Sequence, residues 1–120
     1  MMRLETNDLR AALRRLSPKV TGALLHMRRE TYRDGAVPAK YKLLTALAVA
    51  IALRCEPCIR AYVAMAHKSG VTRRELIEFL EVTIVMQGCP GEEWAVTAYV
   101  AYKECESGAP PTESPSCCTH

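Results

Sequence analysis

Two cysteines three residues apart are the residues best suited to chemistry in this 120-residue chain. They lie in the run Cys55-Glu56-Pro57-Cys58, at the predicted junction between a long apolar helix and the next helix. The unpaired N–H groups and the dipole at a helix start favour a thiolate there. Cys55 is therefore predicted to be the reactive thiolate and Cys58 its resolving partner. The alternatives are half of a zinc site or a pair of buried, inert cysteines.

Two further cysteines lie near predicted helix ends. Cys89 follows Gly88 at a helix start, where it is interpreted either as a third redox thiol or as the N-cap of that helix. Cys105 lies near the end of a helix, where no favourable dipole acts on it, and is expected to have no role.

A vicinal cysteine pair, Cys117 and Cys118, lies near the C-terminus and is followed by His120. One interpretation is an auxiliary thiol relay that exchanges electrons with the Cys55–Cys58 disulfide. Another is a metal site in which the two thiols and His120 bind a soft ion such as Cu(I), Zn(II) or a metalloid. The third is a tail without a function.

The elements that position these thiols are all predicted to be helices, because strand signals are nearly absent. The first helix is expected to bury Leu9, Leu13 and Leu16. Pro18 is expected to open a second helix, and Gly35 to end it in a left-handed conformation. The other helix boundaries are predicted from local signals. Helices are expected to begin at Pro38, at a capping box formed by Thr72 and Glu75, and at Pro90, and to end at Gly70 and Gly88. The fold class is therefore all-α, with about six helices in one domain over residues 1–105 and a flexible tail over 106–120.

Composition and charge limit the functional classes. The chain is 49% hydrophobic and 24% charged, which is ordinary for a globular domain. Its longest predominantly apolar run, residues 43–53, is too short to cross a membrane, and no export signal opens the chain, so the cytoplasm is expected. Residues 1–54 carry a net charge of +7 and residues 55–120 one of −4. The arginines recur at helical spacing without interleaved aromatic residues, which favours solvated helix faces over nucleic-acid binding.

Residues from about 40 to 104 resemble the carboxymuconolactone decarboxylase family, specifically its alkylhydroperoxidase D-like branch. The matching stretches are LTALAVAIALRCEPCI at 44–59 and HKSGVTRREL at 67–76. The resemblance implies an alkylhydroperoxidase D-like helical bundle that assembles into homo-oligomers, either trimers or hexamers. It also implies a dithiol that cycles through a disulfide, in peroxide reduction or in exchange with a partner protein, without a cofactor.

The chain departs from that branch at two positions. The peroxidase members carry a glutamate twelve residues before the first cysteine and a histidine four residues after the second; this chain has Leu43 and Tyr62 there. A tyrosine with a pKa of about 10 is no general base at neutral pH, so Tyr62 is expected to donate a hydrogen bond to a thiolate. The sequence thus predicts a thiol–disulfide oxidoreductase with weak peroxidase activity. The alternatives are a soft-metal or metalloid binding protein, using Cys55, Cys58, Cys117 and Cys118, and a non-catalytic oligomeric member of the family.

Overall fold

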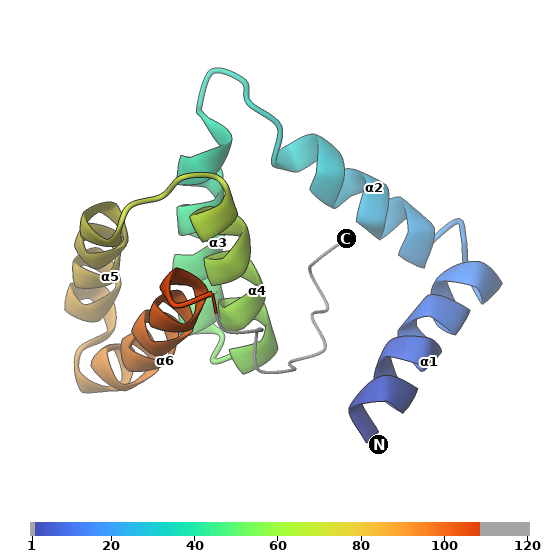
Figure 1. Cartoon of the computed structure of the whole chain (residues 1–120). Helices are drawn as coiled ribbons and strands as arrows, with labels where there is room; N and C mark the ends of the chain where they lie inside the picture. The colour runs from blue at the N-terminus through green and yellow to red at the C-terminus, as the bar shows by residue number, and fades with distance from the viewer. Residues whose placement is uncertain (1, 109–120) are drawn as a thin grey trace.

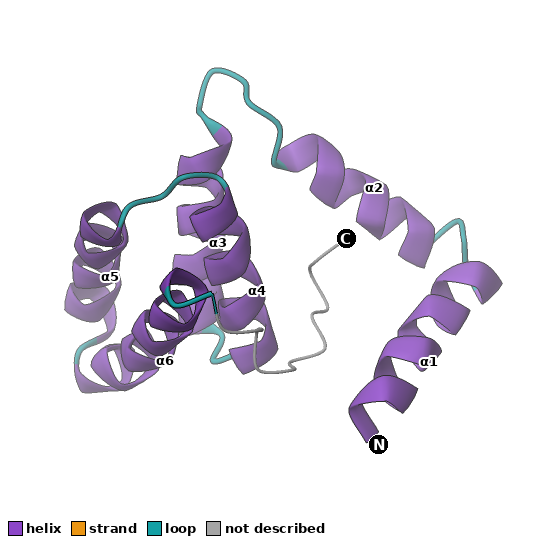
Figure 2. Ribbon diagram, viewed as in Figure 1, coloured by secondary structure: helices purple, strands orange, loops and turns teal. Residues whose placement is uncertain are grey.

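The computed structural model describes residues 2–108, with side chains from residue 8 onward. In chain order its elements are α1 (Met2–Leu16), α2 (Thr21–Thr31), α3 (Ala39–Ala52), α4 (Glu56–Lys68), α5 (Arg73–Gln87) and α6 (Cys89–Glu106). Figures 1 and 2 show these helices joined by short loops, and no strand occurs within residues 2–108. The all-α prediction is confirmed. Most of the predicted tail, residues 109–120, lies outside the described residues.

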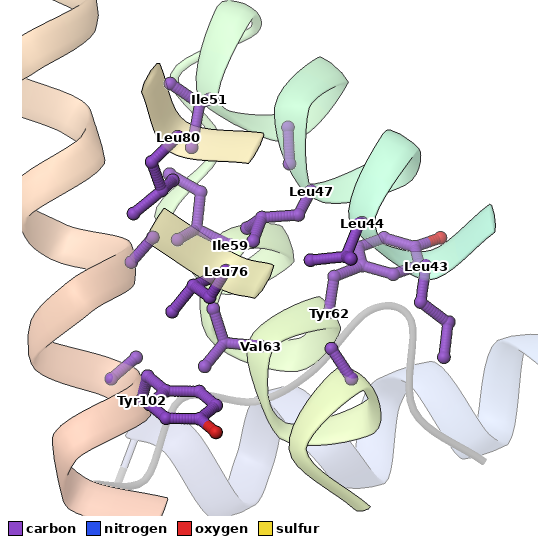
Figure 3. Close-up of a cluster of buried hydrophobic side chains, with 14 of the residues drawn as sticks. Leu43, Leu44, Leu47, Ile51, Ile59, Tyr62, Val63, Leu76, Leu80 and Tyr102 are labelled. Carbon is purple, nitrogen blue, oxygen red and sulfur yellow. The ribbon is translucent and has the colours of Figure 1, made fainter. Parts of the chain in front are cut away.

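The core is built around α3, which packs against α4, α5 and α6. The largest side chains with almost no exposed surface come from α3, α4, α5 and the loop before α5: Leu44, Leu47, Ile51, Ile59, Val63, Val71 and Leu76. Figure 3 shows side chains from α3, α4, α5 and α6 meeting in one cluster. The apolar residues of the third predicted helix therefore form the centre of the domain.

Local signals fix the ends of the core helices. Thr72 and Glu75 form the predicted capping box, with the Glu75 N–H donating to Thr72 Oγ1 at 3.1 Å and the Thr72 N–H to Glu75 Oε1 at 3.0 Å. Gly70 has a φ of +87° and ends α4, and Gly88 has a φ of +69° between α5 and α6. These backbone conformations favour glycine, because a side chain there would meet the following carbonyl.

The first two helices form an N-terminal arm, residues 2–31, that packs against none of the helices α3 to α6. The prediction that Leu9, Leu13 and Leu16 are buried is wrong, because their exposed fractions are 68%, 53% and 82%. The helical period was correct, but none of the helices α3 to α6 packs against the apolar stripe. Figure 1 shows the arm on the side of α3 and α4 opposite to α5.

Two predictions about the ends of α2 are also wrong. The helix begins at Thr21 rather than at Pro18, because residues 18–20 form a turn in which Thr21 Oγ1 donates to the Ser17 carbonyl at 2.7 Å. Gly35 does not adopt a positive φ. The α2–α3 loop is instead held by Asp34, whose Oδ1 accepts from the Ala39 N–H at 2.7 Å and so caps α3.

No helix within residues 2–108 has both the length and the apolar character needed to cross a bilayer.

Candidate functional site

The turn between α3 and α4 brings the cysteine pair to the start of α4. The Arg54 N–H donates to the Ile51 carbonyl at 3.0 Å and the Cys55 N–H to the Ala50 carbonyl at 3.1 Å. These two bonds form a Schellman motif, in which the residue after the helix cap adopts a left-handed conformation. Arg54 takes that position with a φ of +56°, the only non-glycine residue within 2–108 with a positive φ. The chain thus reverses sharply immediately before Cys55.

Cys55 is the N-cap of α4, and Cys58 lies in its first turn. A disulfide joins the two residues, whose Cα atoms are 5.2 Å apart. Pro57 fits between them because the first helical turn has no N–H bond to lose. Both cysteines are half-buried, and Cys58 packs against the core cluster. A dithiol at this position lies in the positive field of a helix start and is still accessible from solvent.

The charged groups beside the pair largely neutralise one another. The Arg60 guanidinium contacts Glu56 at 3.3 Å and Glu104 of α6 at 3.0 Å. Its side chain is 22% exposed, so it lies between α4 and α6 and does not point freely at the sulfurs. Arg60 is therefore held by its two carboxylate partners, and the start of α4 supplies positive potential at the pair.

Tyr62, one turn after Cys58 on α4, is buried and belongs to the same core cluster as Leu43. Its ring points toward the part of α3 that carries Leu43 and Leu44 (Figure 3). The Tyr32 hydroxyl donates to the Tyr62 hydroxyl at 2.9 Å, and the two rings meet edge to face with centroids 5.5 Å apart. The two positions where the peroxidase members carry an acid and a base thus lie in an uncharged cluster.

The other described cysteines are free thiols and lie apart from one another. Gly88, not Cys89, is the N-cap of α6, so the N-cap interpretation of Cys89 is wrong; Cys89 is an exposed residue of the first turn. At 1.5 Å per residue it lies about 22 Å along the α6 axis from Glu104, the residue that reaches Arg60. Cys105 is half-buried, and burial raises the pKa of its thiol. Among the described residues, no three His, Cys, Asp or Glu side chains lie together as a metal site.

Comparison with known proteins assigns the helical fold and the cysteine pair to one protein family. The profile of the carboxymuconolactone decarboxylase family matches residues 18–101, which include the cysteine pair and all of α2 to α5. The chain belongs to this family. The resemblance noted from the sequence is confirmed, and the alkylhydroperoxidase D-like branch is consistent with the match.

Known proteins are similar to this chain along much of its length. A crystal structure of a family protein from Legionella pneumophila, in its apo form, superposes with a TM-score of 0.77 at 32% identity, covering 82% of this chain and 88% of that one. An uncharacterized protein of Cupriavidus necator is 32% identical over 78% of this chain and 83% of its own length. An uncharacterized protein of the cox locus of Paracoccus denitrificans is 30% identical over 61% of this chain and 66% of its own.

The family fold brings together only some of the residues singled out from the sequence. Cys55, Cys58 and Tyr62 lie along the first two turns of α4, whereas Cys89 lies at the far end of α6. Cys117, Cys118 and His120 lie outside the described residues. Sequence reasoning missed Tyr32, which also lines an open hollow of about 460 Å³ beside α3. No local signal marks Tyr32, since its contact with Tyr62 spans thirty residues.

Proposed function

We propose that this protein is a thiol–disulfide oxidoreductase in which Cys55 and Cys58 cycle between dithiol and disulfide. The observation that carries the proposal is the position of the pair, which is bonded, half-buried and at the start of α4. A helix start stabilises a thiolate relative to a thiol, and half-burial leaves a route for a partner. The pair suits a reducing compartment such as the cytoplasm, where disulfides are transient and catalytic.

The reaction proceeds in two exchanges. The Cys55 thiolate attacks one sulfur of a partner disulfide, forming a mixed disulfide and releasing the other partner sulfur as a thiolate. The Cys58 thiolate then attacks Cys55 Sγ, forms the internal disulfide and releases the second partner thiolate. Two electrons pass from the Cys55–Cys58 pair to the partner, whose two thiolates take up protons from solvent. A low-molecular-weight or protein dithiol reduces the pair by the reverse sequence.

The uncharged cluster around Tyr62 favours this exchange over efficient peroxide reduction. A leaving thiolate needs no acid, because thiols ionise near pH 8.5. Cleaving a peroxide O–O bond instead releases an alkoxide or hydroxide, whose conjugate acid is far weaker than a thiol and which therefore leaves well only when protonated. Leu43 cannot supply that proton. Tyr62 stands where the peroxidase members have a histidine, but it has no glutamate at position 43 with which to exchange a proton. Peroxidase activity is accordingly proposed to be weak.

Tyr62 is proposed to act as a hydrogen-bond donor to the thiolate of Cys58. Residues four apart on a helix are neighbours on one face, so Tyr62 and Cys58 lie on the same side of α4. In the bond between the two hydroxyls Tyr62 is the acceptor, and a hydroxyl that accepts one hydrogen bond can also donate another. A donor of this kind stabilises the reduced pair without transferring a proton.

The first experiment is a redox titration of the full chain against glutathione, with differential alkylation and mass spectrometry to follow each cysteine. We expect the Cys55–Cys58 disulfide to form reversibly with a midpoint between about −300 and −120 mV, the range of dithiol catalysts. Metal content is measured on the same sample. A pair that copurifies with stoichiometric metal and resists alkylation would overturn the redox proposal in favour of metal binding.

Single serine variants assign the order of attack. Cys58→Ser is expected to accumulate a mixed disulfide with glutathione at Cys55, and Cys55→Ser to trap far less. Cys89→Ser is the matched control, because it removes an exposed thiol that, like the thiol of Cys55, lies at the start of a helix with a proline in its first turn. Equal trapping by Cys55→Ser would reverse the assigned roles. Disulfide-reductase activity that survives in both single variants would exclude the pair as the catalytic centre.

A further inference from the structure

Arg54 lies immediately before Cys55, in a backbone conformation that an arginine rarely adopts. Its φ is +56°, in the left-handed region that glycine reaches without strain. The turn requires only the backbone of this residue, because main-chain atoms make both of the hydrogen bonds that form it. The fold therefore does not require an arginine at this position. Strained backbone of this kind is concentrated at functional sites.

The Arg54 side chain is exposed and makes no ion pair with any residue in 8–108. Arg60 of α4 is by contrast held between Glu56 and Glu104. The Glu56 carboxylate thus contacts Arg60 and leaves the charge of Arg54 without a partner. A guanidinium is always charged and presents its N–H donors in a fork that matches a carboxylate. Arg54 is therefore a cation beside the disulfide that is open to an incoming anion.

The surface on both sides of Arg54 is open to a partner. Leu53, the residue before it, is 72% exposed, and Cys55, the residue after it, is half-buried. Consecutive Cα atoms are only about 3.8 Å apart. A disulfide that reaches the Cys55 sulfur therefore brings its own neighbouring groups within reach of the Arg54 guanidinium.

We infer that Arg54 is a specificity-determining residue that selects disulfides carrying a carboxylate close to their sulfurs. The inference rests on the proposed function, since it concerns which disulfide the Cys55 thiolate attacks. In that attack Cys55 Sγ bonds to one sulfur of the partner, the partner S–S bond breaks, and the other sulfur leaves as a thiolate. The Arg54 guanidinium binds the carboxylate of the group that becomes attached to Cys55 and so holds the disulfide at the attacking thiolate. It transfers no proton.

The test uses three small disulfides of similar length and different charge. Dithiodipropionate carries two carboxylates, bis(hydroxyethyl) disulfide is neutral, and cystamine carries two ammonium groups. The reduced full chain is mixed with an excess of each probe and quenched with acid. Alkylation and mass spectrometry then give the rate at which Cys55 and Cys58 are oxidised. Dividing the rate constant of the parent by that of a variant, for one probe at a time, cancels the intrinsic reactivity of the probe.

Three variants isolate the charge at position 54. Arg54→Gln removes the charge, and Arg54→Lys keeps it. Arg74→Gln is the matched control, because Arg74 is also exposed and makes no ion pair within the described residues. Arg74 lies in the first turn of α5 and follows the end of α4 opposite to the cysteine pair. Both substituted positions are exposed, so circular dichroism is expected to show unchanged helix content.

Arg54→Gln is expected to slow oxidation by dithiodipropionate about threefold or more relative to the neutral probe, a factor within the range of an exposed ion pair. Oxidation by cystamine should not be slowed relative to the neutral probe, because its ammonium groups gain nothing from a guanidinium. Arg54→Lys should retain most of the preference for the anionic probe. Salt at about 1 M should remove the preference from the parent, because it screens exposed charges.

Equal slowing of all three probes in Arg54→Gln would overturn the inference, because Arg54 would then act on the Cys55 thiolate and not on the partner. Unchanged rates in Arg54→Gln would overturn it too. So would an equal loss of preference in Arg74→Gln, which would assign the preference to the overall charge of the chain. In these three outcomes the probes still oxidise the pair, so the proposed function stands. A pair that none of the probes oxidises would refute the proposed function and the inference together.

Discussion

Replacing Tyr62 with phenylalanine is expected to lower the free energy of unfolding by about 1 kcal/mol, the usual net contribution of a neutral hydrogen bond. Tyr62 is 7% exposed, and its hydroxyl accepts from Tyr32 at 2.9 Å. Phenylalanine keeps the edge-to-face ring contact, which limits the loss to the hydrogen bond. With an m-value of about 2 kcal/mol per molar urea, the unfolding midpoint falls by about 0.5 M.

A double-mutant cycle separates the bond from other effects of the two substitutions. Tyr32→Phe removes the same bond, so the double variant is expected to cost about as much as either single variant, with a coupling energy of about 1 kcal/mol. Unfolding is followed in urea by circular dichroism with the cysteine pair held as the disulfide, so that no thiolate is present to accept from Tyr62. Tyr99→Phe is the control: Tyr99 is half-buried, its hydroxyl makes no hydrogen bond within the described residues, and its substitution should cost less than about 0.5 kcal/mol. A coupling energy below about 0.3 kcal/mol refutes the reasoning.

The same two variants test what Tyr62 does at the cysteine pair. A hydrogen bond to a charged group contributes about 1.5 to 3 kcal/mol, and 1.4 kcal/mol corresponds to about 30 mV for a two-electron couple. Losing a donor to the Cys58 thiolate destabilises the reduced pair, so Tyr62→Phe is expected to move the midpoint potential about 30 to 60 mV more negative. Tyr32→Phe leaves the Tyr62 donor in place and should leave the potential unchanged. An unchanged potential in Tyr62→Phe would make Tyr62 a packing residue only.

Three further predictions concern the scaffold. Arg54→Gly is expected to stabilise the fold by about 0.5 kcal/mol, because relief of a left-handed side-chain conformation outweighs the entropy of glycine in the unfolded chain; a lower urea midpoint would contradict this. Tyr102→Phe is expected to cost about 1 to 3 kcal/mol in urea unfolding, since the buried Tyr102 hydroxyl donates to the Val71 carbonyl at 2.7 Å; a cost below about 0.5 kcal/mol would show that the carbonyl finds another donor. The hydrogen bond from the Lys40 ammonium lowers the pKa of the Glu75 carboxyl. The Glu75 carboxylate therefore stabilises the fold at pH values above the usual pKa of a glutamate, and this stabilisation is lost as the pH falls through the lowered pKa. Glu75→Gln, which keeps a capping side chain, should flatten the acid limb of the urea midpoint against pH, and an unchanged limb would exclude Glu75 as its source.

Local signals in the sequence predicted the core helices well. Gly70 and Gly88 were expected to end helices and both have a positive φ, and Thr72 forms its capping box with Glu75. Each of these features depends only on residues within one helical turn of one another, so the local sequence is enough to predict it. The central position of α3 followed from its apolar composition on all sides for the same reason.

The candidate site was predictable only in part. The spacing of Cys55 and Cys58 placed both at a helix start, and the structure has them there. The Schellman turn at Arg54 was not foreseen, because arginine is not a residue that marks a left-handed position. Tyr32 was also missed, since a contact between residues so far apart in the chain depends on how α2 approaches α4 and not on any local pattern.

The arm shows why an amphipathic pattern alone cannot say what a helix packs against. Leu9, Leu13 and Leu16 have the period of a helix with one buried face, and that period predicts burial without specifying which molecule provides the partner surface. The helix formed as predicted, and only the expected partner was wrong. A groove between α5 and α6 of the same chain has apolar walls and an acidic rim, and neither arm helix packs against α5 or α6. The period of the leucines therefore shows which face of the arm is apolar, and the packing of α3 to α6 shows that none of these helices covers that face.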